Sequence, residues 1–404
     1  MAITTKKPFT FAVAFASMVI FSLSASVSAQ TFDYSTVYSF GAPRLGKYPL
    51  SILLLDSTGR LYGTTVAGGT FKYGAIYEIS ASGAEKAIYS FTGGSDGRNP
   101  SGGLISDPDS NLYGVTGSGG DLSCNAPNGC GTVFKLDASR KFSVLHTFSA
   151  QEGYLYGAPA PYSELVRDRL GSLYGSLGFA QGWPNGAIYK LDPLGNLTIL
   201  HLFAGDTDGS GPNSLIMDQA GNLYGTTQTG GIGGTYGYGT VFKLDPAGHI
   251  TNLYNFAGGS DGYHPQGALV RDSAGNVYGA TAYDGDPICA CGTLFKLNLQ
   301  SRTETVLHTF TGGDGEYPNG HLILDSAGNL YGTGAGGGSF QNGVVFELDP
   351  NGVYSVLHDF AGGLDGKIPN AGLIMDRAGD LFGTTYYGGG TGNGVGTVYK
   401  LTPQ

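Results

Sequence analysis

The chain has 404 residues, including 71 Gly, 26 Tyr and 21 Phe, and only 13% of its residues are charged. So much Gly without a collagen period, together with abundant aromatic residues, excludes a disordered chain and favours β structure rich in turns. The net charge of -10 argues against nucleic acid and anionic membrane surfaces as partners, because no basic cluster offsets it.

The N-terminal segment, residues 1–29, has the pattern of a secretory signal peptide. Lys6 and Lys7 precede an apolar run from Phe9 to Leu23, and small residues then lead to Ala29. We therefore expect cleavage after Ala29 and a mature chain, residues 30–404, that forms a single domain. No later segment is apolar enough to be a transmembrane helix, so we predict a secreted or periplasmic protein at the cell exterior.

The mature chain is built from a repeat of about fifty residues. Each copy holds four segments with the composition of short β-strands, called a to d in chain order. Segment a is an apolar run that ends in Asp. Segment b holds Leu-Tyr-Gly or a near variant, and its aromatic residue recurs as Tyr62, Tyr113, Tyr174, Tyr224, Tyr278, Tyr331 and Phe382.

The two remaining segments are also regular. Segment c resembles Gly239-Thr-Val-Phe-Lys-Leu-Asp245, and segment d resembles Val144-Leu-His-Thr-Phe148. Turn sequences between a and b, and between c and d, predict a four-stranded antiparallel meander for each copy.

The two ends of the mature chain indicate how the repeats close. The chain starts with a lone segment d that ends at Phe40, and it stops after a lone segment c that contains Tyr399. Seven segments d match seven sets of segments a, b and c only if the first segment d completes the last blade. This arrangement is the usual closure of a propeller. We therefore predict an all-β, seven-bladed β-propeller of four-stranded antiparallel blades, closed by this N-terminal strand, and we expect a monomer.

Four motifs recur in fixed order along the mature chain. They are Gly-Thr-Val-Phe-Lys-Leu-Asp-Pro, Val-Leu-His-x-Phe, Gly-Gly-x-Asp-Gly-x-x-Pro and Gly-Asn-Leu-Tyr-Gly-Thr-Thr. In these motifs the chain resembles the GloVer tandem-repeat proteins of bacterial exteriors. The resemblance implies an exported repeat protein, and it supplies no established activity or catalytic residues.

Antiparallel order places the b–c and d–a loops on one face of the propeller, called the upper face. These loops vary in length and chemistry, so we expect function there. Five d–a loops carry an Asp-Gly pair, whose carboxylates can bind cations or sugar hydroxyls, although Asp-Gly is also a common turn pair. The carboxylates are those of Asp96, Asp208, Asp261, Asp314 and Asp365.

A second set of upper-face residues follows the Pro that opens each segment a. Because segment a is innermost in a propeller, these residues should surround the mouth of the central channel. Amides there can bind a polar ligand, or else cap their own turns or hold channel water. The four amides at this position are Asn213, Gln266, Asn319 and Asn370.

The third blade departs from the repeat in both of its upper loops. Its d–a loop is longer than the equivalents and lacks the Asp-Gly pair, and its b–c loop holds the only Trp of the chain. The aromatic rings can form a platform for a sugar or another flat, amphipathic ligand, or they can belong to a drifted repeat in which they pack together. These residues are Tyr154, Tyr156, Tyr162, Phe179 and Trp183.

The four Cys fall into two local pairs. In an exported chain Cys124 and Cys130 can close a disulfide loop, whereas Cys289 and Cys291 are expected to be strained or reduced because one residue separates them. Neither pair has the spacing of a zinc site. We therefore expect no metal and no cofactor.

Histidine recurs at one position of segment d, where other blades have Tyr. This exchange indicates packing rather than proton transfer or metal ligation. Elsewhere, His264 and His321 lie near the tops of neighbouring inner strands and could approach one another at the channel mouth, with Glu164 as a further candidate.

Our leading hypothesis is a non-enzymatic exported propeller that binds carbohydrate or another extracellular polymer through its upper face. The alternatives are a secreted lyase or hydrolase, similar to virginiamycin-type propeller lyases in fold alone, and a structural module of the envelope. An enzyme would need an acid/base or metal group at the channel mouth, and His264, His321 and Glu164 are its candidates.

Overall fold

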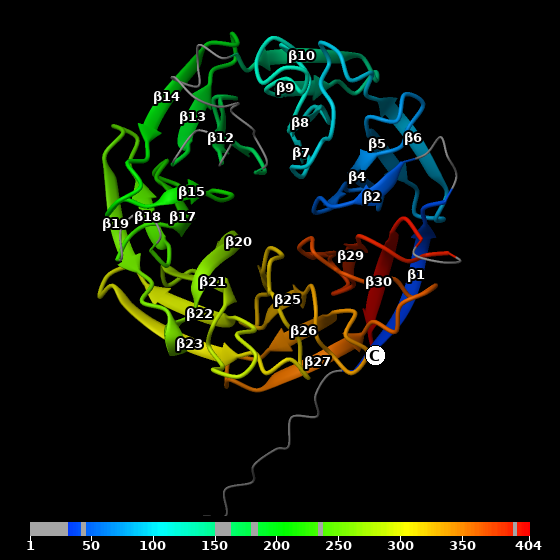
Figure 1. Cartoon of the computed structure of the whole chain (residues 1–404). Coiled ribbons are helices and arrows are strands. Elements are labelled where there is room, and N and C mark those ends of the chain that lie inside the picture. The colour runs from blue at the N-terminus through cyan, green and yellow to red at the C-terminus, as the bar shows by residue number, and fades with distance from the viewer. Residues whose placement is uncertain (1–30, 42–45, 150–162, 179–184, 233–236, 391–393) are drawn as a thin grey trace, which may run out of the picture. The chain divides into compact units, whose positions relative to one another are not determined.

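The structure is a computed structural model, and it describes residues 31–41, 46–149, 163–178, 185–232, 237–390 and 394–404. In these residues each repeat forms one antiparallel sheet, and seven sheets stand around a common axis (Figure 1). The predicted seven-bladed β-propeller is thereby confirmed. Blades are numbered in chain order, so that blade one contains β4 (Leu61–Ala67) and blade seven contains β30 (Thr397–Pro403).

Within each blade the four strands lie side by side in the order a to d, with strand a nearest the centre of the ring and strand d on the outside. The innermost strands, a, are β2 (Lys47–Pro49) with β3 (Leu54–Leu55), β7 (Ile105–Ser106), β11 (Val166–Arg167), β15 (Ser210–Pro212) with β16 (Ile216–Met217), β20 (Tyr263–Arg271), β24 (Ile323–Leu324) and β28 (Ile374–Met375). Strands b are β4, β8 (Leu112–Thr116), β12 (Leu173–Leu177), β17 (Leu223–Thr229), β21 (Asn276–Tyr283), β25 (Leu330–Gly334) and β29 (Leu381–Thr385).

The outer half of each blade is equally regular. Strands c are β5 (Ala75–Ile79), β9 (Thr132–Leu136), β13 (Ala187–Leu191), β18 (Thr240–Leu244), β22 (Thr293–Asn298), β26 (Val344–Leu348) and β30. Strands d are β6 (Glu85–Ser90), β10 (Phe142–Thr147), β14 (Leu197–Leu202), β19 (Ile250–Asn255), β23 (Thr303–Thr309), β27 (Tyr354–Asp359) and, for blade seven, β1 (Phe32–Ser39). The described residues also include the 3-10 helix η2 (Gly259–Asp261), and they contain no helix long and apolar enough to cross a bilayer.

The ring is closed by the first strand, as the lone segment d predicts. β1 pairs antiparallel with β30, from Phe32 opposite Pro403 to Ser39 opposite Thr397. The Phe40 amide then donates a hydrogen bond to the Gly396 carbonyl oxygen at 3.0 Å. Blade seven therefore contains both ends of the described chain, and closure covers the edge that an open series of blades would expose.

Neighbouring blades meet through one recurring aromatic contact. The Phe that ends strand d of each blade packs edge-to-face on the aromatic residue of strand c in the next blade, with ring centres 5.0 to 5.4 Å apart. The pairs are Phe40–Tyr77, Phe91–Phe134, Phe148–Tyr189, Phe203–Phe242, Phe256–Phe295, Phe310–Phe346 and Phe360–Tyr399. This geometry is the favourable one for aromatic pairs.

The Gly of Leu-Tyr-Gly makes room for the same strand c ring. A Cβ atom added to Gly225 would lie 2.7 Å from Phe242 Cζ, and one added to Gly279 would lie 2.5 Å from Phe295 Cζ. Since these rings are fully buried, no larger residue fits at this position. In Leu-Tyr-Gly, the Leu is therefore a buried core residue, the Tyr hydroxyl bonds to the Asp of the turn between strands a and b, and the Gly leaves space for the aromatic ring of strand c.

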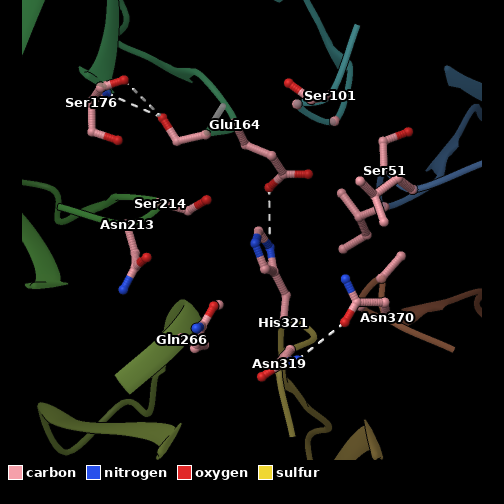
Figure 2. Close-up of a pocket in the computed structure, with 18 of the residues that line it drawn as sticks. Ser51, Ser101, Glu164, Ser176, Asn213, Ser214, Gln266, Asn319, His321 and Asn370 are labelled. Carbon is pink, nitrogen blue, oxygen red and sulfur yellow. Dashed lines mark hydrogen bonds and ion pairs between the residues drawn. The ribbon is translucent and has the colours of Figure 1, made fainter. Parts of the chain in front are cut away.

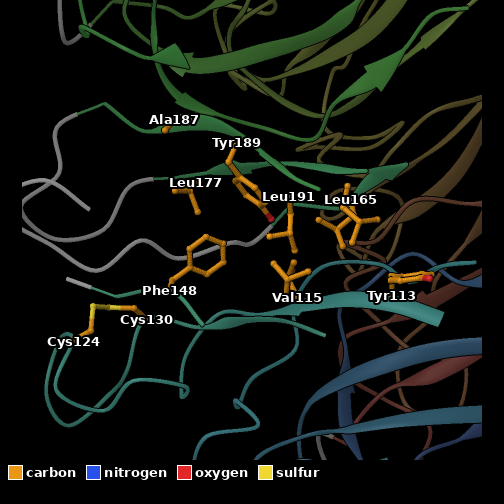
Figure 3. Close-up of a cluster of buried hydrophobic side chains, with 12 residues drawn as sticks. Tyr113, Val115, Cys124, Cys130, Phe148, Leu165, Leu177, Ala187, Tyr189 and Leu191 are labelled. Carbon is orange, nitrogen blue, oxygen red and sulfur yellow. A yellow bond between two sulfur atoms is a disulfide. The ribbon is translucent and has the colours of Figure 1, made fainter. Parts of the chain in front are cut away.

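The hydrophobic core is divided among the seven interfaces between blades. In the interface between blades two and three, Val115 and Phe148 pack against Tyr189 and Leu191 (Figure 3). Each of the other six clusters likewise combines residues of two adjacent blades. A single blade cannot bury these faces, so the core is complete only in the closed ring.

The Asp that ends segment a organises the turn below each blade. Asp218 accepts hydrogen bonds from the backbone amides of Ala220 and Asn222, from the Asn222 side chain and from the Tyr224 hydroxyl, over 2.8 to 3.1 Å. Burial acts to raise the pKa of this carboxyl, but the hydrogen bonds outweigh burial and hold the pKa below its ordinary value. The lower face is therefore occupied by structural turns.

Candidate functional site

The innermost strands enclose a polar cavity of about 430 Å³ on the axis of the propeller (Figure 2). All seven blades contribute residues to its wall. The residue that follows the Pro of segment a lines the cavity in six blades, as Leu50, Ser101, Asn213, Gln266, Asn319 and Asn370. The structure thus brings together the four amides that the repeat pattern singles out.

One of these amides is held by the protein itself. The Asn213 side chain donates hydrogen bonds to Thr226 Oγ1 at 2.9 Å and to the Pro265 carbonyl oxygen at 2.7 Å. It also accepts one from Gln228 Nε2 at 3.0 Å. Asn213 therefore links blades four and five, and its first role is structural.

The other amides have free capacity. Asn319 Nδ2 donates to Asn370 Oδ1 at 3.2 Å, while Asn319 Oδ1 is buried without a partner among the described residues. Ser101 Oγ is in the same condition, and the Gln266 side chain has no hydrogen-bond partner in the described part of the chain. Because buried polar groups are normally satisfied, the two buried atoms on Ser101 and Asn319 indicate positions that water or a polar ligand completes, and the partly exposed Gln266 adds a free amide beside them.

The cavity also contains an imidazole–carboxylate pair that spans it. His321 Nδ1 lies 3.2 Å from Glu164 Oε2, and both side chains are about four-fifths buried, with exposures of 18% and 21%. Glu164 comes from blade three and His321 from blade six, and Figure 2 shows them reaching toward each other from opposite walls. An imidazole beside a carboxylate can hold or move a proton, so this pair is the one acid/base candidate in the described cavity wall.

Small residues leave room for the pair. The two partners occupy the same repeat position, three residues after the Pro of segment a, where blades two and seven have Gly103 and Gly372. A Cβ atom on Gly103 would overlap the Glu164 carboxylate, and one on Gly372 would lie 2.6 Å from His321 Cβ. The sequence signal that identifies the pair is therefore the presence of two long polar side chains at a repeat position where the other blades have small or apolar residues.

His264 is not among the residues that line the cavity. Its ring packs edge-to-face against Tyr263 and Tyr283, with ring centres 5.1 and 5.6 Å apart. Burial lowers the pKa of His264 below its ordinary value. The approach between His264 and His321 that we expect from their neighbouring strands is replaced by the pair of His321 with Glu164.

The five Asp-Gly carboxylates hold their own loops together. Each one pairs with the His or Tyr of strand d in the same blade and accepts a backbone amide hydrogen bond where strand d ends. The partners are Tyr89 with Asp96, His201 with Asp208, Tyr254 with Asp261, His308 with Asp314 and His358 with Asp365, over 2.9 to 3.1 Å. Histidine and tyrosine exchange at this position because both can donate to a carboxylate.

In blade five this bonding affects the charge of the loop carboxylate, Asp314. Burial of Asp314 favours its neutral form, but hydrogen bonds from His308 and Thr311 outweigh burial and keep the pKa of Asp314 below its ordinary value. Each of the five carboxylates lies in its own loop. In the residues that the structure describes, the only group of three metal-type ligands is Cys289, Cys291 and Glu316.

Both cysteine pairs are placed so that they can form disulfides. Cys124 and Cys130 have Cα atoms 5.6 Å apart, and the pair adjoins the core between blades two and three (Figure 3). Cys289 and Cys291, the pair for which strain or reduction is expected, lie with their Cα atoms 5.1 Å apart, and that expectation stays a prediction.

The aromatic residues expected in the loops of blade three, Tyr154, Tyr156, Tyr162, Phe179 and Trp183, lie outside the described residues. A different aromatic group is present on the upper face, where Tyr238, Tyr263, Tyr283 and Tyr317 lie close together. The sequence pattern does not single out this group, because its members occupy four different repeat positions on three blades.

Comparisons with known proteins agree with this architecture. A family model described as the Gloeobacter/Verrucomicrobia repeat matches residues 14–233 and 232–404. Among curated proteins, no significant match is found. Among solved structures, the oligogalacturonate lyase from Vibrio parahaemolyticus is 11% identical, with a TM-score of 0.56 over 92% of this chain and 97% of the lyase.

A second similar structure belongs to a signalling protein. The extracellular domain of a protein described as a hybrid two-component system from B. thetaiotaomicron is 15% identical, with a TM-score of 0.54 over 92% of this chain and 41% of that chain. At such identities the likeness shows the propeller fold alone. Since the family model covers residues 14–404 in two consecutive matches, this chain belongs to the Gloeobacter/Verrucomicrobia repeat family.

Proposed function

We propose that this protein is an exported, glycan-binding propeller whose ligand enters the central cavity from the upper face. The observation that carries the proposal is a set of polar groups in the cavity wall without a partner among the described residues: the buried atoms Ser101 Oγ and Asn319 Oδ1, and the partly exposed side chain of Gln266. Amides and hydroxyls of this kind suit the hydroxyl groups of a sugar, which both donate and accept hydrogen bonds. Export is inferred from the pattern of residues 1–29.

The size and charge of the cavity support a small neutral ligand. Its volume of about 430 Å³ lies within the range of small-molecule sites, about 300 to 1,000 Å³. The only ionisable side chains in its described wall are Glu164 and His321, which face one another. A neutral polar molecule can therefore enter without leaving a buried charge unpaired.

A double variant, Gln266→Ala with Asn319→Ala, tests the site. We expect it to bind glycans about tenfold or more weakly than the wild type, because each lost hydrogen bond to a buried ligand is worth about 1 kcal/mol. A glycan-array screen followed by calorimetry measures the effect. Asn351→Ala, in an exposed turn of the lower face, is the matched control and should bind normally. Absence of binding by the wild type, or equal binding by the double variant, would overturn the proposal.

A second candidate function, a lyase or hydrolase acting on a glycan in the same cavity, is favoured by the Glu164–His321 pair. In this reaction one partner would accept a proton from the substrate or from water, and the other would stabilise the charge that develops. The fold likeness to oligogalacturonate lyase supplies no residue for this chemistry.

Glu164→Gln distinguishes an enzyme from a binding protein. It keeps the shape of the side chain and removes its basicity, so we expect glycan cleavage to slow by about a hundredfold or more while affinity stays unchanged. Release of reducing ends or of unsaturated products measures the rate. Asp109→Asn, which neutralises an exposed carboxylate in a lower-face turn, is the control. A wild type that binds glycans but cleaves none would leave binding as the function.

A further inference from the structure

Four tyrosines and one histidine form a continuous aromatic surface on the upper face, here called the tyrosine rim: Tyr238, Tyr263, His264, Tyr283 and Tyr317. Successive Tyr rings have centres 5.8, 5.3 and 5.6 Å apart, and His264 packs against the middle two. Tyr238, Tyr283 and Tyr317 are 36 to 39% exposed. The rim crosses blades four, five and six, which follow one another around the ring (Figure 1).

The backbone holds two of these rings at the rim. His264 and Tyr317 each precede the Pro of segment a, and they have φ angles of 53° and 52°, a left-handed conformation that residues other than Gly rarely adopt. Their amides donate to carbonyl oxygens of the preceding blade, on Tyr238 and Cys291, at 3.0 Å. Interblade hydrogen bonds therefore impose this conformation and fix where the side chains stand.

The fold does not require aromatic residues at these positions. The equivalent residues of other blades, Tyr48, Asn99 and Ile368, have the same left-handed conformation with φ of 53 to 62°. The side chains of Asn99 and Ile368 are thus equally compatible with this backbone conformation. Half-exposed rings also contribute less to stability than buried ones, so a binding role explains the run of aromatic residues better than packing does.

The tyrosine rim adjoins the central cavity through the chain itself. Pro265 separates His264 from the cavity residue Gln266, and in the next blade one Pro separates Tyr317 from the cavity residue Asn319. Residues two apart in an extended strand are about 7 Å apart. A ligand that occupies the cavity and extends over blades five and six would therefore lie on the rim.

The charges near the rim are negative. Asp284 follows Tyr283 directly, and Glu316 precedes Tyr317. Burial, followed by the charge of Asp284, raises the pKa of Tyr263 above its ordinary value. No Lys or Arg stacks on these rings in the described part of the chain. Carboxylates at the edge of a site disfavour anionic ligands, so the rim suits an uncharged partner.

We propose that the tyrosine rim is a second subsite, which holds successive sugar rings of a neutral glycan whose adjoining ring occupies the central cavity. This inference rests on the proposed function and deepens it from a single sugar to an extended chain. The C–H faces of pyranose rings can stack on exposed faces of tyrosine rings, and a surface that crosses three blades suits an extended chain better than a compact one. The cavity then selects one sugar unit, and the rim adds affinity for the units beside it.

The test uses neutral β-linked gluco-, manno- and xylo-oligosaccharides of one to six units, titrated calorimetrically. We expect wild-type affinity to rise about tenfold or more between one unit and four, as stacking contacts are added. Tyr238→Ala combined with Tyr283→Ala should abolish this rise and leave binding of the single sugar unchanged. Tyr73→Ala is the matched control, because Tyr73 occupies the same loop position in blade one with similar exposure, 40% against 39%.

The outcomes separate the two proposals. Affinity that does not depend on chain length, or a double variant that retains the length dependence, would overturn the proposed rim subsite. The proposed cavity site would be unaffected by either result. Absence of binding at every length in all three series would overturn both. A β-linked oligoglucuronate series run in parallel checks the charge argument, since anionic chains should bind more weakly than neutral chains of equal length and linkage.

Discussion

A chain that begins at Gly41 instead of Thr31 is expected to lose the closed propeller. The deletion removes β1, whose seven residue pairs with β30 complete blade seven. It also removes Phe40, which is 1% exposed and packs on Tyr77 of blade one. Loss of a buried Phe alone costs about 3 to 5 kcal/mol. Together with the lost ladder hydrogen bonds, at about 1 kcal/mol each, this approaches the whole stability of a typical domain, about 5 to 15 kcal/mol.

Thermal unfolding followed by circular dichroism measures this loss, with a chain that begins at Thr31 as the control. Phe40→Ala should have an intermediate effect, a loss of about 3 to 4 kcal/mol, because it empties the closing interface without removing the strand. Phe256→Ala makes the same change at an internal interface and calibrates it. If the chain that starts at Gly41 melted cooperatively near the temperature of the control, closure by β1 would not be needed for the fold.

Gly225→Val is expected to destabilise the protein by about 3 kcal/mol. A Cβ atom at residue 225 lies 2.7 Å from Phe242 Cζ and 3.0 Å from Leu215 Cδ2, so the substitution forces a buried ring out of its position. The β-branched side chain would suit a strand by propensity, but steric overlap in a dense core exceeds that preference. Denaturant titration measures the loss.

Two further variants identify the cause. Combining Gly225→Val with Phe242→Leu should cost less than the sum of the single changes by about 1 kcal/mol or more, since the smaller residue gives back the space. Gly313→Val should be almost neutral, because nothing lies within 4 Å of an added Cβ atom there. Simple additivity of the two changes would show that Gly225 is required for another reason.

The repeat shows where sequence reasoning works well. Each blade is a local unit whose strands and turns are specified by neighbouring residues, so a pattern repeated seven times indicates strand order and closure together. From the sequence, the exchange of His201 with Tyr254 at one repeat position likewise indicates that this side chain packs in the blade. Its further meaning, a hydrogen bond to Asp208 or Asp261, depends on the path of the loop and is evident only in three dimensions.

The sequence by itself determined the seven blades, the closing strand and the position of the amides around the axis, because these follow from periodicity and from the order of strands in a blade. Only the tertiary structure decided that Glu164 meets His321 rather than His264 meeting His321, and that Tyr238, Tyr263, Tyr283 and Tyr317 form one surface. The physical reason is ring closure. It brings blades three and six to opposite walls of one cavity, and it joins loops from consecutive blades at angles that local sequence does not specify.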